Sequence, residues 1–205
     1  MEDIRDILFS QVSRSRITAC IFSDGDGVLS GVERAAAKAA ELGLTVNYAA
    51  CEGAALMAGD LVMELCGPPK AIAKAEDNLM GLMLKPSGIA TAAARFVRAA
   101  GDMRIVCGSW KKLPREIKPL IRDAVTAGGA GVRICEEPMV YLDKNYVEML
   151  GGIQSSLRAA EQLGDRKKVI QIRGKYENGD IVREAFSAVS AGADIVFVDT
   201  GRLSD

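Results

Sequence analysis

The chain has 205 residues, of which 49% are hydrophobic and 26% are charged, and its 26 Lys and Arg against 27 Asp and Glu give a net charge of -1. This composition is typical of a globular protein and excludes general disorder, and without a basic excess we expect no nonspecific nucleic-acid binding. The sequence contains no histidine, which excludes a Ser-His-Asp triad, a Cys-His pair and any histidine metal site.

The N-terminal half mixes short strands with helices. Apolar residues at helical spacing predict a short helix, and an Ala-rich helix ends at Gly43. Short β-rich pieces separated by turns in 44–67 predict a small antiparallel layer, and two further helices follow, one of them opened by prolines. The predicted elements are helix 2–12, strand 16–22, helix 31–43, the β-rich region 44–67, and helices 68–84 and 86–101.

From residue 104 onward, apolar runs alternate with helical patterns, which predicts βα units and a parallel sheet. The candidate strands are 104–110, 131–138, 169–175 and 194–200, and the candidate helices are 114–129, 144–163 and 180–193. Four strands do not close a barrel, so a truncated barrel, an open sheet and a fragment of a longer protein all remain open. We expect an N-terminal domain over 1–103 and a second domain over 104–205.

The five cysteines are widely spaced and form no CxxC pair, which argues against a disulfide framework and a zinc site. The N-terminal segment MEDIRDILFS is acidic and does not resemble a signal peptide. Since no apolar run is long enough to span a bilayer, we expect a cytoplasmic protein without a membrane partner.

Functional groups of parallel sheets gather at the carboxyl ends of the strands. Segment 104–118 holds five cations and one acid, so Lys111 is a candidate for an anion site, although the other cations of this segment also suit a solvated helix face. Trp110 could stack on a planar ring or lie in the core.

Polar residues also occur at the other predicted strand ends. Arg133 lies within an apolar run, and a buried arginine there needs either an anionic ligand or a salt bridge. Asp199 could orient a ribose hydroxyl, hold magnesium or cap the next loop. Gln171 and Arg173 follow the third candidate strand, and Lys144 lies in a polar loop cluster.

The ordered set of motifs resembles the quinolinate phosphoribosyltransferase family, also called nicotinate-nucleotide pyrophosphorylase (carboxylating), over nearly the whole chain. Ser-Gly-Ile-Ala-Thr at 87–91 occurs in the family unaltered, and the strand ending at Asp199 resembles its Leu-Asp-Asn strand. The other matching segments are GVLSG (27–31), EGAALMAGDLVMELCGPPKAI (52–72), AEDNLMGLMLKPSGIAT (75–91), WKKLP (110–114), AVTAGGAGVRI (124–134), LDKNYV (142–147) and GADIVFVDT (192–200).

The resemblance implies an α/β protein with an N-terminal α/β sandwich-like domain and a C-terminal incomplete, open parallel α/β barrel. It also implies a homodimer in which the N-terminal domain of one subunit roofs the barrel of the other. Such proteins condense quinolinate with phosphoribosyl pyrophosphate on magnesium, giving nicotinate mononucleotide, pyrophosphate and carbon dioxide. Basic side chains bind the two carboxylates of quinolinate, and acidic groups bind magnesium and the ribose.

The chain keeps Lys111, Arg133 and Asp199 of the family pattern but departs from it elsewhere. A family arginine supplied by the partner subunit aligns with Asp77, the strand-end arginine with Trp110, and the histidine before Arg133 with Val132. Three further differences concern the second half of the chain. The family lysine aligns with Asp143, beside Lys144, the strand carboxylate aligns with Gln171, and the C-terminal phosphate-binding loops have no counterpart.

We therefore expect a divergent pentosyltransferase of this type, a glycosyltransferase that acts on a small heteroaromatic other than quinolinate. The alternative is a non-catalytic homologue that serves as a dimeric ligand-binding or scaffold protein. The predicted site has catalytic Lys111 and Asp199, with Asp199 also holding Mg²⁺. The residues predicted to bind a small anionic or heteroaromatic ligand are Arg133, Trp110, Lys144, Gln171 and Asp77.

Overall fold

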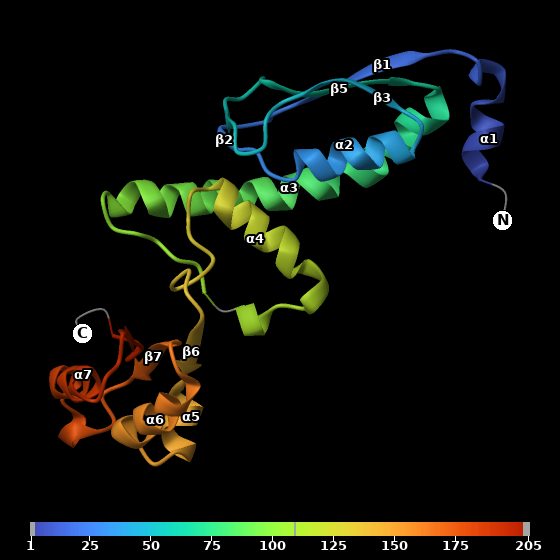
Figure 1. Ribbon diagram of the computed structural model, residues 1–205. Helices are drawn as coiled ribbons and strands as arrows, with labels where there is room; N and C mark the ends of the chain where they lie inside the picture. The colour runs from blue at the N-terminus through green and yellow to red at the C-terminus, as the bar shows by residue number, and fades with distance from the viewer. Residues whose placement is uncertain (1–2, 109, 203–205) are drawn as a thin grey trace. The chain divides into compact units, whose positions relative to one another are not determined.

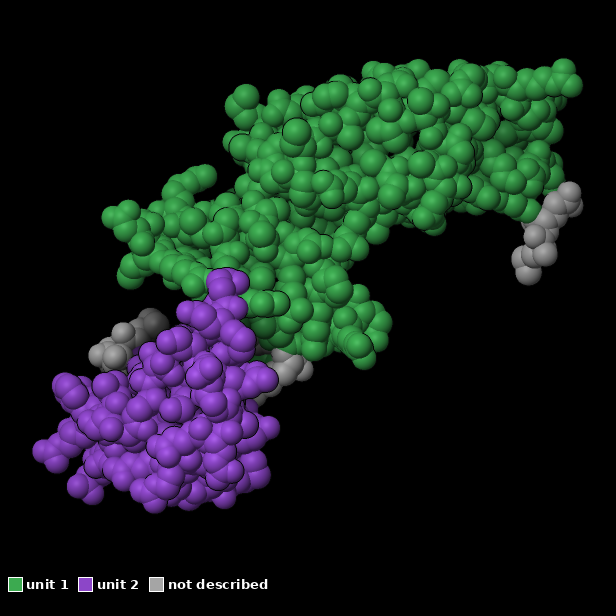
Figure 2. Space-filling model, in the orientation of Figure 1, with its two compact units in different colours: residues 1–134 green, residues 135–205 purple. Residues whose placement is uncertain are grey.

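The structure is a computed structural model that describes residues 3–108 and 110–202, and it divides into two compact units, residues 1–134 and 135–205 (Figures 1 and 2). The predicted N-terminal helix and strand are present, although residue 2 of the helix lies outside the described part. The elements of the first unit in chain order are α1 (Ile4–Leu8), a 3-10 turn (Ser10–Val12), β1 (Ile17–Phe22), β2 (Gly27–Val28), α2 (Val32–Glu41), β3 (Thr45–Ala49), β4 (Ala55–Leu56), β5 (Leu61–Gly67), α3 (Pro69–Ala100), two 3-10 turns (Trp110–Lys112 and Arg115–Ile117) and α4 (Lys118–Ala127).

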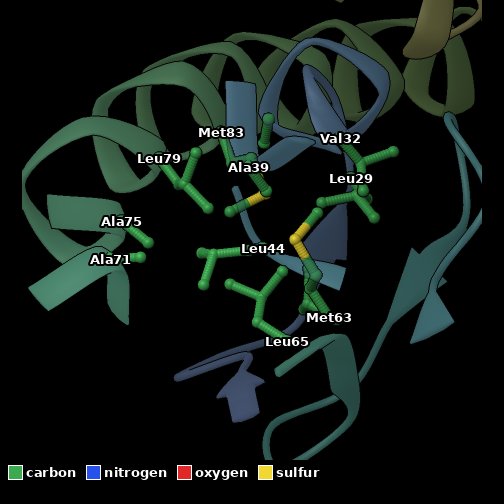
Figure 3. Close-up of a cluster of buried hydrophobic side chains, with 12 residues drawn as sticks. Leu29, Val32, Ala39, Leu44, Met63, Leu65, Ala71, Ala75, Leu79 and Met83 are labelled. Carbon is green, nitrogen blue, oxygen red and sulfur yellow. The ribbon is translucent and has the colours of Figure 1, made fainter. Parts of the chain in front are cut away.

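The first unit has an antiparallel sheet of order β1-β5-β3, beside which α2 and α3 run (Figure 1). The predicted antiparallel layer is therefore confirmed. Met63 and Leu65 of the central strand β5 are buried in one cluster with Leu79 and Met83 of α3 (Figure 3). Burying these side chains stabilises the unit, because each large apolar side chain removed from water is worth about 1.5–3 kcal/mol.

The two helices predicted over 68–84 and 86–101 are one helix of 32 residues, α3, with Pro86 inside it. Proline has no backbone N–H, so the carbonyl of Leu82 lacks its usual helical donor. Gly31 packs against this carbonyl and against Pro86, leaving no room for a side chain. The prediction of a helix break was wrong because the tightly packed loop before α2 supports the helix where proline interrupts its hydrogen bonds.

The Ser-Gly-Ile-Ala-Thr segment has a structural role inside this unit. The hydroxyl of Ser87 accepts a hydrogen bond from the Ser30 N–H at 3.0 Å, and the hydroxyl of Thr91 accepts one from the Val28 N–H at 2.9 Å. Both hydroxyls project from α3 onto the chain that leads into α2. The backbone N–H groups of Val28 and Ser30 are thereby hydrogen-bonded by side chains rather than by a strand partner.

The second unit is a parallel three-stranded sheet of order β6-β7-β8, with helices in the connections. This confirms the predicted parallel α/β arrangement, which is open within the described residues. Its elements are β6 (Met139–Leu142), α5 (Lys144–Met149), α6 (Ile153–Ala160), a 3-10 turn (Glu161–Leu163), β7 (Lys167–Ile172), a 3-10 turn (Glu177–Gly179), α7 (Ile181–Ser190) and β8 (Ile195–Val198).

Two of the four predicted strands were wrong. Segments 104–110 and 131–138 make only a single parallel bridge, between Val106 and Gly131, and residue 109 lies outside the described part. The strand instead follows Pro138, where Val140 and Tyr141 favour extended backbone. The helix predicted over 144–163 is divided into α5 and α6 at Gly151 and Gly152, whose φ angles are 81° and 113°.

No helix in the described ranges combines the length and the apolar character that a bilayer crossing requires.

An ion pair at the amino end of β8 predicts how stability depends on pH. Asp194 Oδ2 accepts from the Lys168 N–H at 2.8 Å, and Oδ1 lies 3.2 Å from Lys167 Nζ. The Lys168 N–H and then the Lys167 ammonium lower the pKa of Asp194 from 3.8. The stabilisation by Asp194 is therefore fully present above pH 3.8, the ordinary pKa of the group, and is lost as the pH falls through the lower pKa of the folded state.

We expect Asp194→Asn to lower the denaturation midpoint at neutral pH, and we expect the difference from wild type to shrink as the pH falls below 3.8. Urea denaturation of both proteins across this range measures it. A difference that grows toward acid would contradict the assignment.

Candidate functional site

The described structure brings three predicted residues together at the carboxyl ends of the parallel strands. Gln171, 7% exposed on the central strand β7, donates from Nε2 to the Asp199 carboxyl group, and its Oε1 accepts from the Lys144 N–H at 2.9 Å. Both ends of the amide are thus used, so Gln171 fixes Asp199 relative to the start of α5. The predicted clustering at the strand ends is therefore present for Lys144, Gln171 and Asp199.

The side chain of Lys144 is exposed, and it forms no ion pair with the described residues. Its neighbour Asp143 caps α5, accepting from the N–H groups of Asn145 and Tyr146 at 2.9 and 3.3 Å. The Asp143 carboxyl group thereby orders the first turn of α5, and the ammonium group of Lys144 takes no part in this cap.

Tyr141 belongs to the same edge and was missed by the sequence analysis. Its ring packs edge to face on Phe197 of β8, with centroids 6.2 Å apart. Burial raises the pKa of the Tyr141 phenol, and the charges of Asp143 and Asp199 raise it further. The phenol therefore remains a proton donor at neutral pH. The alternation of side chains along β6 could have indicated Tyr141, but the strand was predicted over 131–138 instead.

Trp110 lies in the first unit and is engaged on its edge and on one face. Its Nε1 donates to the Val132 carbonyl at 3.1 Å, and the guanidinium of Arg122 lies 5.1 Å from the ring centroid. Arg122 thus occupies a ring face on which a planar ligand was expected to stack.

The structure describes the side chain of Arg133 but not that of Lys111, the other predicted basic residue of the first unit. Lys111 lies in the 3-10 turn Trp110–Lys112, and its side chain is outside the described part. Arg133 is exposed rather than buried as predicted, because residues 132–134 form bends instead of a covered strand. Its carbonyl oxygen accepts from Arg104 at 3.3 Å.

Asp77 on α3 forms an ion pair with Arg5 of α1. The same helix surface holds Lys70 and Lys74, which pair with Asp6 at 2.5 Å and with Asp3 at 3.0 Å. The negative charge at position 77 is therefore neutralised within the same unit, by a residue that the sequence analysis did not consider. Opposite charges in 2–12 and in the first turns of 68–84 were the available signal.

Magnesium would have to be held at the strand ends by few protein ligands, since the described residues contain no group of three or more acids, cysteines or histidines placed to bind a metal. Mg²⁺ commonly takes only one or two carboxylates and completes its shell with water and substrate phosphates. Asp199, held by Gln171, fits that pattern. The residues present therefore suit a magnesium ion that arrives with a phosphate-containing substrate.

Comparison with known proteins gives the same family across both units. The model of "Quinolinate phosphoribosyl transferase, N-terminal domain" matches residues 6–87, and that of the C-terminal domain matches residues 89–205. The probable nicotinate-nucleotide pyrophosphorylase [carboxylating] of Methanothermobacter thermautotrophicus is 28% identical over 90% of this chain and 66% of its own length. The human nicotinate-nucleotide pyrophosphorylase [carboxylating] is 29% identical over 88% of this chain and 60% of its own length.

Solved structures agree on the fold. NadC from Streptococcus pyogenes superposes with a TM-score of 0.82 at 23% identity, covering all of this chain and 71% of that one. The nicotinate-nucleotide pyrophosphorylase from Ehrlichia chaffeensis gives a TM-score of 0.81 at 16% identity over 98% of this chain and 72% of that one. The chain spans about two thirds or less of the length of the curated relatives named above, 66% and 60%. Because the family models match successive segments of both units, the chain belongs to the quinolinate phosphoribosyltransferase family.

Proposed function

We propose that the chain transfers a phosphoribosyl group from phosphoribosyl pyrophosphate to a heteroaromatic ring that carries less negative charge than quinolinate. The bond between ribose C1 and the pyrophosphate oxygen breaks, the oxygen keeps the electron pair, and a ring nitrogen forms the new bond to C1. The observation that carries this proposal is the cluster of Lys144, Gln171 and Asp199 at the strand ends, in a chain of this family.

Five of the predicted residues have a role in the proposal. Asp199, oriented by Gln171, faces the ribose hydroxyls and the metal, while Lys144 binds phosphate oxygens. Lys111 and Arg133, which the chain keeps of the family pattern, remain candidates for binding an anionic group. Mg²⁺, when bound, would neutralise charge on the departing pyrophosphate.

The less acidic ring is supported by what replaces the family's cations. Trp110 and Val132 have no charge, and Asp77 carries a negative charge that Arg5 neutralises. A dicarboxylate bound without these cations would leave buried charge uncompensated, at a cost of several kcal/mol. A ring with one carboxylate or none avoids most of this penalty.

The proposal includes a homodimer, as the family resemblance implies. Apolar side chains are exposed in rows on α1, at Ile4, Ile7 and Leu8, and on α7, at Val182, Phe186 and Val189. Exposed apolar rows are typical of surfaces that another subunit covers. We expect light scattering to give twice the chain mass of 21.8 kDa. A single species at the chain mass would contradict the dimer.

The test measures binding and turnover separately. Phosphoribosyl pyrophosphate with Mg²⁺ is expected to raise the thermal unfolding midpoint. Chromatography of reaction mixtures is then expected to show more nucleotide product with a monocarboxylate ring, such as nicotinate, than with quinolinate. Absence of any stabilisation contradicts the proposal, and preferred turnover of quinolinate contradicts its substrate class.

The alternative function, a non-catalytic ligand-binding homologue, is favoured by the Arg122 guanidinium, which occupies a face of Trp110. It predicts stabilisation by phosphoribosyl pyrophosphate without product from any ring. The same two measurements therefore separate the two functions.

A further inference from the structure

The loop after β7 is organised around a buried carboxyl group. Glu184 on α7 is 0% exposed and accepts hydrogen bonds from three loop N–H groups: those of Arg173 at 3.1 Å, Gly174 at 2.8 Å, and Tyr176. A buried carboxyl group is tolerated when its oxygens are fully hydrogen-bonded, as here. The loop backbone is thereby held to α7 immediately after the strand end.

This anchoring places the side chain of Arg173 across the end of the neighbouring strand. Its Nε donates to the carbonyl oxygen of Asp199 at 3.3 Å, and the Asp199 N–H donates to the Ile172 carbonyl at 3.0 Å. Arg173 therefore lies beside the residue whose carboxyl group Gln171 holds. The Nε contact fixes the direction of the guanidinium group without using its two terminal nitrogens.

Those terminal nitrogens make no hydrogen bond or ion pair with the residues at 3–108 and 110–202. Arg173 is exposed, and within the described part of the chain its guanidinium group hydrogen-bonds only to a main-chain oxygen. A positioned guanidinium with two unused donors matches the geometry of a phosphate group, which it can bind through two parallel hydrogen bonds.

We propose that Arg173 binds a phosphate group of the substrate at the strand ends, and that Glu184 is a positioning residue that acts through the loop. The inference rests on the proposed function, whose phosphate-containing substrate supplies the group to be bound. It adds a residue that the family motifs found in the sequence did not include, and it makes α7 part of the site's support.

The experiment uses inorganic pyrophosphate with Mg²⁺ as the probe, titrated calorimetrically into the full chain. Arg173→Ala is expected to weaken binding about tenfold to a hundredfold, and Arg173→Lys, which keeps the charge but loses the paired donors, by less. Arg183→Ala is the matched control, because Arg183 is exposed on α7 and pairs with Asp180 at 3.3 Å. It is expected to bind like the wild type.

Glu184→Gln tests the positioning role. It is expected to weaken pyrophosphate binding and to speed hydrogen exchange of the amides at 173–176. We expect Arg173→Ala to weaken binding less in the Glu184→Gln background than in the wild type. A merely structural role of Glu184 would give the same loss of affinity in both backgrounds.

The outcomes distinguish the inference from the proposed function. Wild-type affinity in Arg173→Ala, with the wild type binding the probe, overturns the inference and leaves the proposed function standing. No binding by the wild type overturns both. Fully additive effects of the two substitutions remove Glu184 from the proposal.

Discussion

Gly31→Ala is expected to lower the free energy of unfolding by roughly 2–5 kcal/mol. Gly31 has φ +88°, where an L-residue with a side chain is strained by about 1–2 kcal/mol. A Cβ at this position would also overlap the carbonyl oxygen of Leu82 and contact Pro86. Overpacking of this kind adds about 1–3 kcal/mol, because the carbonyl group of Leu82 belongs to the backbone of α3 and cannot move aside.

Gly43→Ala separates the two contributions. Gly43 follows α2 with φ +80°, but nothing lies within 4 Å of a Cβ built there. It should show the conformational strain alone, about 1–2 kcal/mol. Urea denaturation of the wild type and both variants measures the difference. Equal destabilisation would mean that the contact between Gly31 and α3 contributes nothing.

The contact at Gly31 also shows where sequence patterns fail. Helical spacing of apolar residues predicted the helical character of 68–101 correctly, because those residues form the buried face of α3. Pro86 predicted a break because local chemistry disfavours proline inside a helix. Whether the freed carbonyl is tolerated depends on a loop more than fifty residues earlier, which no local pattern reveals.

A similar limit applies to the strands. The strands 16–22, 169–175 and 194–200 were predictable because their apolar runs are long and bounded by turns or charged residues. Segment 131–138 was wrong because its apolar run is short, and the acids and proline after it end the extended stretch before β6.

The site shows the same division between local and long-range information. Gln171 and Asp199 were predictable as neighbours, because carboxyl ends of adjacent parallel strands meet at one edge. Glu184 was not, because a carboxyl group in a helix usually faces water. Its position three residues after Ile181 and four before Ala188, on the buried face of α7, was the only signal.

Asp199→Asn is expected to reduce kcat/KM for phosphoribosyl pyrophosphate by about 100-fold to 1000-fold, the usual loss when one fixed electrostatic group is removed. The substitution keeps the shape and keeps an oxygen that can accept from Gln171 Nε2, so the site geometry should survive. Only the negative charge is removed. In the proposed reaction, that charge would stabilise the positive charge that develops at ribose C1 as pyrophosphate leaves.

Asp194→Asn is the matched control, because Asp194 immediately precedes β8 and Asp199 immediately follows it. The same change of charge on the same strand, at the edge away from the proposed chemistry, should leave kcat/KM within about twofold, since its effect falls on the Lys167 pair and on acid stability. Steady-state kinetics on both variants, with the ring that the wild type turns over, compares the two edges directly. If Asp199→Asn retained wild-type kcat/KM, the carboxyl group held by Gln171 would be structural, and the transferase proposal would lose its central residue.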